Sequence, residues 1–306
     1  MTNSLDTALK QAGKIILGKQ DQIRLAITCL LARGHLLIED IPGVGKTTLA
    51  NTLARVLGLD FQRVQFTSDL LPADILGVSV YRQQDGRFEF HRGPIFTQLV
   101  LADEVNRASP KTQSALLEAM EEHQVTIDGN SHTLPRPFFV IATQNPNYQI
   151  GTFPLPESQL DRFLMSIQIG YPPREAEKAL LADRERRELL SEMQPVMTAA
   201  DLSEHQRAAT RVHVSEALID YILALVAHTR SSGEYREGLS PRAGLAMRSC
   251  AQAWALLDGR DAVLPEDVQA ILPSVVMHRL EGVNEAGSGS GRDALARRLL
   301  EAVPLP

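Results

Sequence analysis

The sequence predicts an α/β fold, with a mostly parallel sheet between helices and an all-helical region after it. Short apolar runs alternate with helical patterns through the first half of the chain, and a glycine-rich turn joins one such pair. After Tyr171-Pro172-Pro173, charged helical patterns dominate and no clear strand follows. The 306 residues are enough for two domains. We therefore expect an α/β domain at 1–171 and an all-helical domain at 172–306.

The first predicted elements are a helical region, a strand and a further helix. Residues 1–34 carry apolar side chains at helical spacing. Residues 35–39 form a short apolar run that ends at the glycine-rich turn, which is typical of a buried strand. Residues 47–57 return to helical spacing, and Gly58 closes this helix.

Four more apolar runs predict the rest of the sheet, and a helical pattern over 110–122 separates two of them. Alternation of this kind places the strands in parallel, with helices on both faces. A ligand site is then expected at the carboxyl ends of the strands. The four runs are residues 61–66, 99–102, 138–143 and 164–169.

Two hairpins are expected to interrupt this alternation. Each shows strand-like residues on both sides of an Asp-Gly pair, and both residues of such a turn adopt positive φ. The first covers residues 78–90 around Asp85-Gly86, and the second covers 125–134 around Asp128-Gly129.

The C-terminal residues predict a link and a short helix. Residues 287–291 read Gly-Ser-Gly-Ser-Gly, which is typical of a flexible link. Leu295, Leu299 and Val303 then fall on one helical face, so a short docked helix is expected there.

Composition argues weakly against some classes of function. The formal net charge of -6 disfavours a general polyanion binder, because phosphate contacts need clustered Lys and Arg. The two cysteines, Cys29 and Cys250, lack a metal-ligand spacing, and Cys29 lies in an apolar run where a buried thiol is expected. A reduced, cytoplasmic chain is therefore expected. The apolar stretch 218–226 is too short to span a bilayer.

The motif Gly43-Val44-Gly45-Lys46-Thr47-Thr48 stands between the predicted strand and helix. Backbone N–H groups of such a loop and of the helix N-terminus converge on one concavity and bind phosphate oxygens. Lys46 is suited to the β- and γ-phosphates of ATP, and the Thr47 hydroxyl to Mg²⁺. The alternative is a glycine-rich turn with a solvated lysine, which the flanking elements disfavour. The residues expected to bind ATP are Asp40, Ile41, Pro42, Gly43, Val44, Gly45, Lys46, Thr47 and Thr48.

The motif departs from the usual P-loop at its first position, where Asp40 replaces the glycine expected five residues before Gly45. Aspartate adopts left-handed φ more readily than most residues, so the turn can form. A carboxylate near phosphate is unfavourable unless it points away. The motif is therefore a variant of the P-loop.

Two carboxylates follow the apolar run at residues 99–102. Asp103 is expected to hold Mg²⁺ together with Thr47, through water, and Glu104 to orient and polarise the attacking water. An Asp-Glu pair after an apolar run is by itself often a solvated strand end. The preceding P-loop favours the catalytic interpretation.

Asn145 follows the apolar run at residues 138–143. Its side chain is expected to hydrogen-bond the γ-phosphate or the attacking water. An Asn-Pro turn is the alternative, since this dipeptide is common in turns. Its register with the two preceding strands favours the catalytic role.

Three long runs resemble the MoxR family of AAA+ ATPases. The resemblance extends from about Leu17 to the C-terminal residues and implies a P-loop AAA+ core with a smaller all-helical lid. The first run, from Ala102-Asp103-Glu104 to Met120-Glu121-Glu122, is similar to the Walker B signature of that family. The others are Ser68-Asp69-Leu70-Leu71-Pro72-Ala73-Asp74-Ile75-Leu76-Gly77 and Phe153-Pro154-Leu155-Pro156-Glu157-Ser158-Gln159-Leu160-Asp161-Arg162-Phe163.

The resemblance implies roles for two arginines and both hairpins. Arg162 matches the arginine finger that reaches a neighbouring subunit's site, and Arg242 matches sensor 2 in the lid. The first hairpin resembles the helix-2 insert, and the second resembles the hairpin before sensor 1; in related motors such insertions project into a central pore. From the residues alone, Arg162 could cap a helix or pair with Asp161, and Arg242 could simply start a helix after Pro241.

Three classes of function share these motifs. The resemblance implies an ATP-hydrolysing ring, expected to be a hexamer, that remodels or matures a protein client or assists metal-cofactor insertion, together with a von Willebrand factor A-like partner. A nucleic-acid motor is the alternative, but the first hairpin balances Arg82 and Arg87 against Asp85 and Glu89, and the second has no Lys or Arg. A small-molecule kinase would not need carboxylate and amide groups arranged for attack by water.

Overall fold

The structure, a computed structural model, describes residues 2–84, 86–145, 151–182, 186–283 and 292–305. Its central strands are β1 (Leu36–Glu39), β2 (Phe61–Gln65), β5 (Leu99–Asp103), β8 (Phe139–Gln144) and β9 (Met165–Ile167). They form one sheet in the order β2-β5-β8-β1-β9, and every neighbouring pair is parallel. The parallel sheet predicted from the apolar runs is therefore confirmed.

Successive residues of the central strands face opposite sides of the sheet. In β5, Leu99 and Leu101 belong to one cluster of buried side chains, whereas Val100 and Ala102 belong to a second. This alternation follows from the period of two in an extended strand. Both faces are covered, so the strands read as continuous apolar runs rather than as alternating ones.

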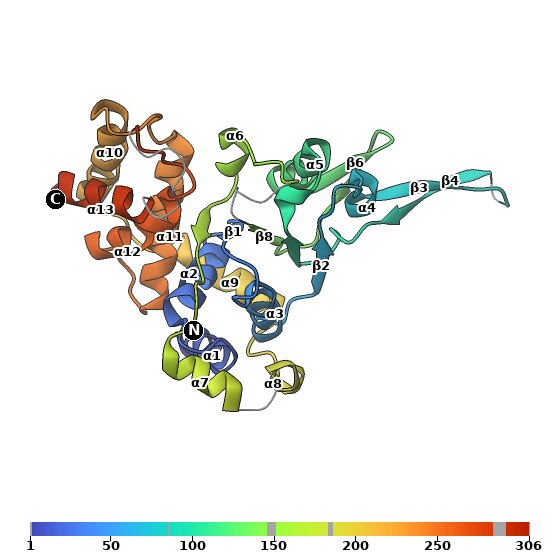
Figure 1. The fold of residues 1–306 in the computed structure, drawn as a ribbon, viewed down its shortest axis with the longest axis horizontal. Coiled ribbons are helices and arrows are strands. Elements are labelled where there is room, and N and C mark those ends of the chain that lie inside the picture. Colours follow the sequence, from blue (N-terminus) through green and yellow to red (C-terminus); the bar gives the residue numbers. More distant parts are fainter. Residues whose placement is uncertain (1, 85, 146–150, 183–185, 284–291, 306) are drawn as a thin grey trace.

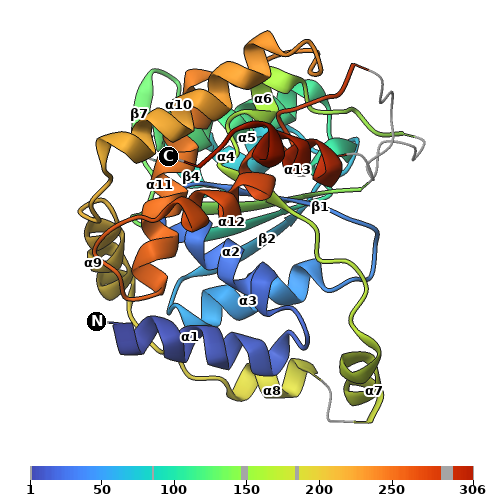
Figure 2. The same cartoon turned by 90° about the vertical axis from the view of Figure 1, so that its left-hand side faces the viewer.

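Helices cover both faces of this sheet. On one face, α1 (Thr2–Ile15), α2 (Gln20–Leu31) and α3 (Lys46–Val56) contribute buried residues to the first cluster (Figure 2). On the other face, α4 (Pro72–Leu76) and α5 (Pro110–Glu122) contribute to the second. The predicted arrangement, a sheet with helices on both faces, is therefore confirmed.

Residues 1–34 form two helices instead of a continuous one. Helix α1 ends at Ile15 and α2 begins at Gln20. Between them Gly18 has φ +67°, and a Cβ at this position would lie 2.8 Å from the Cδ of Pro173. The left-handed backbone and the packed proline end the first helix at a point that apolar spacing does not reveal.

After β9 the regular elements of the described residues are helices. The β structure among these residues is limited to two isolated bridges, between His213 and Ala262 and between Tyr235 and Gly282. The absence of further strands among these residues agrees with the sequence pattern. The helices are α7 (Arg174–Ala182), α8 (Arg186–Glu192), α9 (Ala199–Ala209), α10 (Glu216–Ser231), α11 (Pro241–Leu257), α12 (Pro265–Val276) and α13 (Arg292–Ala302).

The last helix is docked on its predicted face. Leu295, Leu299 and Val303 are buried, and α13 packs against α10 and α12. Their cluster is continuous with the one that covers the first face of the sheet, so the C-terminal helices share a core with the α/β region. The predicted link at 287–291 lies outside the described residues.

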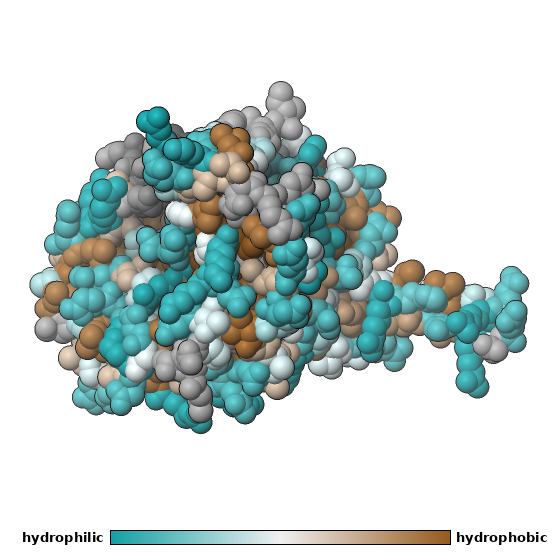
Figure 3. All heavy atoms as spheres, turned by 90° about the horizontal axis from the view of Figure 1, so that it is seen from below, coloured by the Kyte–Doolittle hydropathy of each residue, from teal (hydrophilic) through white to brown (hydrophobic). Residues whose placement is uncertain are grey.

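The first hairpin consists of β3 (Gly77–Arg82) and β4 (Arg87–Arg92). It extends as an arm from the end of the molecule opposite α10 and α13 (Figure 1). In the space-filling view this arm stands clear of the body and carries several apolar patches (Figure 3). The hairpin is confirmed, while Asp85 of its turn lies outside the described residues.

The second hairpin consists of β6 (Gln124–Ile127) and β7 (Asn130–Thr133), which pair antiparallel. Asp128 and Gly129 have φ of 50° and 78°. Both turn residues are therefore left-handed, as the Asp-Gly pair predicts.

Two further sequence observations concern the cysteines and the membrane. Cys29 and Cys250 are buried free thiols, so the expected burial of Cys29 is confirmed. Across the described ranges, the helices lack the combination of length and apolar character that crossing a bilayer requires.

Candidate functional site

The turn between β1 and α3 has the backbone conformation of a phosphate-binding loop. Gly43 and Gly45 have φ of 86° and 97°, in the left-handed region that glycine adopts without strain. Helix α3 begins at Lys46, and no side chain caps its N-terminus. The first N–H groups of the helix therefore remain available, which makes this end suited to an anion.

Lys46 lies within this turn and is buried. Its Nζ donates to the backbone oxygen of Asp40 at 2.5 Å and to Oδ1 of Asn145 at 3.2 Å. Burial lowers the pKa of Lys46, and the nearby carboxylates oppose this shift. The lysine thus connects the P-loop to the residue after β8, as expected for groups that meet at the carboxyl edge of a parallel sheet.

The Asp40 carboxylate points away from the loop's concavity. Oδ1 accepts a hydrogen bond from the N–H of Ile41 at 2.8 Å. Oδ2 accepts from the N–H groups of Ile169 and Gly170 at 2.7 and 2.6 Å. The aspartate therefore joins the first residue of the P-loop to the segment that follows β9, and its negative charge is held by backbone amides.

Asp103 ends β5 as a largely buried carboxylate whose two oxygens both accept hydrogen bonds. Oδ1 accepts from Oγ1 of Thr143 at 2.6 Å. Oδ2 accepts from the Arg63 guanidinium, with distances of 3.1 Å to Nε and 2.7 Å to Nη2. Because neither oxygen is unpaired, a contact to a metal ion through water suits this carboxylate better than a direct one.

Glu104 has φ 57°, which turns its side chain out of the strand direction. Its N–H donates to Oγ1 of Thr143 at 2.8 Å. Oε1 accepts from Nδ2 of Asn145 at 3.0 Å, while Oε2 accepts from Gln65 and Arg107, each at 2.9 Å. The carboxylate is thus held by donors contributed by β2, β8 and the turn after β5.

Asn145 connects the lysine to the glutamate. Its Oδ1 accepts from Lys46 and its Nδ2 donates to Glu104, so the chemistry of both partners fixes the orientation of the amide. The backbone oxygen of Asn145 also accepts from Asn106 at 3.1 Å. Lys46, Asn145 and Glu104 therefore form one continuous polar chain.

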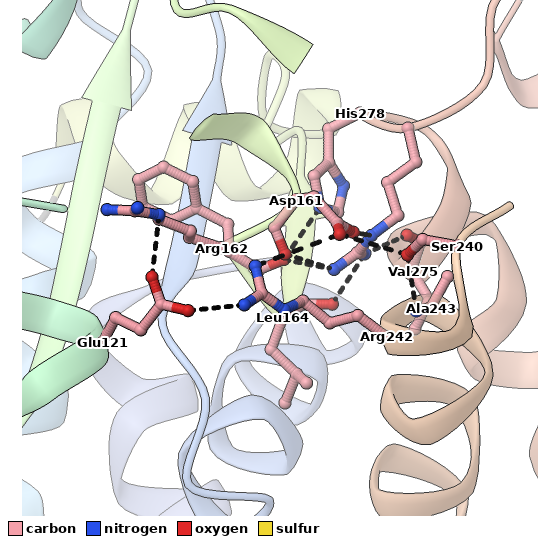
Figure 4. Close-up of polar contacts among 11 residues, drawn as sticks. Glu121, Asp161, Arg162, Leu164, Ser240, Arg242, Ala243, Val275 and His278 are labelled. Carbon is pink, nitrogen blue, oxygen red and sulfur yellow. Dashed lines mark hydrogen bonds and ion pairs between the residues drawn. The ribbon is translucent and has the colours of Figure 1, made fainter. Parts of the chain in front are cut away.

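The two arginines singled out in the sequence lie in a different cluster. Nε of Arg162 is 3.1 Å from Glu121, and Nη2 of Arg242 is 2.6 Å from the other oxygen of Glu121 (Figure 4). Arg242 also lies 4.0 Å from Asp161. The structure thus brings Arg162 and Arg242 together, and their ion pairs with the described residues are to Glu121 and Asp161 rather than to the Lys46–Asn145–Glu104 chain.

Arg279 is a residue of this second cluster that the sequence did not indicate. It is buried in the turn after α12 and donates from Nε to Oδ1 of Asp161 at 2.7 Å. It also donates to the backbone oxygens of Phe163 and Leu164 at 2.6 and 3.1 Å. Burial lowers its pKa, and the Asp161 carboxylate opposes that shift. Arg279 therefore fixes the turn that carries Arg162 to the C-terminal helices.

Two polar residues near Glu104 were also not assigned roles from the sequence. Thr143 bridges Asp103 and Glu104, and Arg63 lies against Asp103 from the neighbouring strand β2. A threonine at the end of an apolar strand and an arginine in an edge strand are common features. The register of β2, β5 and β8 was needed to bring them to this site.

The residues present fit Mg²⁺ bound together with a nucleotide. Over the described part of the chain, no group of three or more His, Cys, Asp or Glu side chains is placed to hold a metal on its own. Mg²⁺ is usually held by one or two carboxylates, waters and substrate phosphates rather than by a cage of protein ligands. The Thr47 hydroxyl and Asp103 suit such a site.

Comparisons with known proteins agree with this arrangement. The family described as "ATPase family associated with various cellular activities (AAA)" matches residues 35–165, and the AAA lid domain matches 227–297. A crystal structure of a proposed ATPase from Cytophaga hutchinsonii superposes with a TM-score of 0.89 at 36% identity, covering 100% of this chain and 96% of that one. Fold and site together define a P-loop ATPase of the AAA class.

Related sequences narrow this class further. Chaperone MoxR1 of Mycobacterium tuberculosis is 39% identical over 99% of this chain and 83% of its own length. Protein MoxR of Paracoccus denitrificans is 32% identical over 95% and 93%. An uncharacterized Bacillus subtilis protein, YeaC, is 45% identical over 99% and 95%. The chain belongs to the MoxR family of AAA+ ATPases.

Proposed function

We propose that this chain binds ATP with Mg²⁺ and hydrolyses it to ADP and phosphate in order to remodel or mature a protein partner. The observation that carries the proposal is the chain of contacts Lys46–Asn145–Glu104 beside the P-loop. It brings a cation for the terminal phosphates, an amide that can orient water and a carboxylate that can polarise water into one place.

Each residue of this chain has a distinct role in the proposal. Lys46 binds the β- and γ-phosphates, which compete with Asp40 and Asn145 for its ammonium group. Glu104 polarises the attacking water, and Asn145 holds that water or the γ-phosphate in line. Mg²⁺, when bound, would neutralise charge on the phosphates. Thr47 and Asp103 would hold it, Asp103 through water.

We further propose that Arg162 and Arg242 both serve the site of a neighbouring subunit in a ring, which we expect to be a hexamer. Both arginines pair with Glu121, and neither has an ion pair with the described residues of its own Lys46–Asn145–Glu104 chain. We infer from this placement that the two arginines act on the site of another copy of the chain. In this proposal the nucleotide-binding domain ends, and the lid begins, near residue 172.

The first hairpin supports a protein client rather than a nucleic acid. Phe88 is 72% exposed and Tyr81 52%, and their ring centroids lie 5.3 Å apart. Arg82 is paired with Glu89, which offsets the charge of one of the arm's arginines. An exposed aromatic pair on a projecting arm is typical of protein contacts. A von Willebrand factor A-like protein is the partner that the family resemblance leads us to expect beside this client.

Lys46→Ala should weaken nucleotide binding by at least about 100-fold, or roughly 2.7 kcal/mol, a loss in the range of charge-assisted hydrogen bonds. Titration with a fluorescent ATP analogue in the presence of Mg²⁺ measures this. Lys10→Ala is the control, because Lys10 is an exposed lysine on α1. Unchanged affinity in Lys46→Ala would remove the basis for the P-loop assignment.

Replacing both Tyr81 and Phe88 by Ala should weaken binding of an unfolded protein such as casein by about tenfold or more, since aromatic anchors contribute about 1.4 kcal/mol or more at protein interfaces. Affinity for the ATP analogue should be unchanged. Arg87→Ala on the same arm is the matched control, and it should have little effect. Stimulation of ATP hydrolysis by DNA or RNA at physiological salt, lost in Arg87→Ala, would instead support the nucleic-acid motor.

A further inference from the structure

Glu121 lies at the C-terminal end of α5, between two arginines that come from other elements. Its Oε2 is 3.1 Å from Nε of Arg162, which follows α6 (Glu157–Leu160). Its Oε1 is 2.6 Å from Nη2 of Arg242, the second residue of α11. Figure 4 shows the carboxylate reaching both guanidinium groups at once. One side chain thus brings together three segments that are distant in sequence.

The other acid of the cluster cannot substitute for Glu121. Asp161 lies 4.0 Å from Arg242, but its Oδ1 accepts from Arg279 at 2.7 Å and its Oδ2 from Ser240 at 3.1 Å. Within the described part of the chain, the ion pairs of Asp161 are to Arg242 and Arg279. Among the described residues, Glu121 is therefore the carboxylate that the two arginines share.

Two guanidinium groups held side by side repel one another, and each arginine side chain loses rotamer freedom when it is ordered. Arg162 and Arg242 are 30% and 47% exposed, so packing alone does not hold them. A carboxylate between them turns the repulsion into two attractive contacts. Without it, the two cations would be expected to separate.

The contacts leave much of the Arg162 guanidinium available. A guanidinium has five N–H donors in a planar fork, and Arg162 contacts Glu121 through Nε. Its terminal nitrogens are turned away from Glu121 (Figure 4). Glu121 can therefore hold Arg162 through Nε while the terminal nitrogens of the guanidinium bind an anion.

We propose that Glu121 is a positioning residue that holds Arg162 and Arg242 together, so that both can stabilise the charge that develops on the phosphates in the neighbouring subunit's site during hydrolysis. This inference rests on the proposed function, in which both arginines act on that site. Glu121 does not touch the nucleotide itself. It acts through the two arginines, so its loss should resemble a weaker form of their loss.

Glu121→Gln is the test, because it preserves shape and removes the charge between the arginines. Glu122→Gln is the matched control, since it removes the same charge from the next exposed position of α5. Steady-state ATP hydrolysis should fall by about 10–100-fold in Glu121→Gln, less than the roughly 10³–10⁵-fold loss expected when an arginine finger is removed. Affinity of the variant for a fluorescent ATP analogue and its thermal unfolding should match those of Glu122→Gln.

Mixing two variants tests whether Glu121 positions the arginines or only supports the structure. Glu121→Gln subunits keep their own Lys46 and Glu104, so adding Glu104→Gln subunits, whose arginine pair is intact, should restore hydrolysis. Glu121→Asp keeps the charge and should regain part of the activity that Glu121→Gln loses. Activity of Glu121→Gln equal to the control, absence of rescue, or equal losses in the Asp and Gln variants would each overturn the proposal.

The same assay distinguishes this inference from the proposed function on which it rests. If Arg162→Ala subunits are rescued by Glu104→Gln subunits but Glu121→Gln subunits are not, the interfacial arginine stands and the role of Glu121 is refuted. If neither variant is rescued although subunit exchange is demonstrated, the action of Arg162 on a neighbouring site fails, and the role of Glu121 fails with it.

Discussion

Replacing Glu104 by Gln should leave ATP binding intact and lower hydrolysis by about 10²–10⁴-fold, the contribution of a positioned general base. The carboxylate lies against Asn145, Gln65 and Arg107, all of which donate hydrogen bonds to it. Gln keeps the shape but loses the charge that polarises water. Its amide nitrogen would also face a donor, so at least one of these contacts must break.

Steady-state phosphate release and titration with a fluorescent ATP analogue measure the two effects separately. Glu118→Gln is the matched control, since Glu118 is an exposed glutamate on α5 outside both clusters. Turnover of Glu104→Gln within about twofold of wild type, far from the loss expected of a catalytic base, would contradict the role assigned to Glu104.

Arg162→Ala should lower hydrolysis by roughly 10³–10⁵-fold, the effect of removing an arginine that stabilises charge on a transferring phosphoryl group. The variant keeps its own P-loop, Glu104 and Asn145, so its affinity for an ATP analogue should change little. Arg248→Ala, at an exposed position on α11, serves as the control.

Mixing Arg162→Ala with Glu104→Gln subunits tests whether the arginine acts on a neighbour. Each variant alone should be nearly inactive. In a mixed ring, a Glu104→Gln subunit presents an intact Arg162 to the intact Glu104 of an Arg162→Ala subunit, and activity should reappear. Hydrolysis is measured against mixing ratio at constant total protein. A flat line at the level of the single variants, after subunit exchange has been shown, would refute an interfacial finger.

Much of the site's arrangement could be predicted because parallel strands end at one edge of a sheet. Lys46, Asp103, Glu104 and Asn145 each follow or terminate an apolar run, so a parallel sheet had to bring them together. In the structure, hydrogen bonds join Lys46 to Asn145 and Asn145 to Glu104, and Asp103 is bonded to Thr143 beside them. The sequence indicated only that an Asp40 carboxylate facing phosphate would be unfavourable; its direction came from the structure.

Other contacts depend on packing between distant segments, which local pattern does not encode. Arg279 and Asp161 are separated by 118 positions, and Glu121 and Arg242 by 121. Each is an ordinary charged residue on a helix or turn, where a solvated side chain is the usual outcome. The helix break at Gly18 was missed for a similar reason, because the proline that packs against it lies beyond residue 170.

Asp40 couples the P-loop to residues outside it. Its carboxylate accepts from the N–H groups of Ile41, Ile169 and Gly170, while its backbone oxygen accepts from Lys46. Glycine at this position would leave those three amides without their acceptor. Residue 40 is therefore coupled to residues 169–170, and replacing Asp40 by Gly should loosen the P-loop from the chain that follows β9.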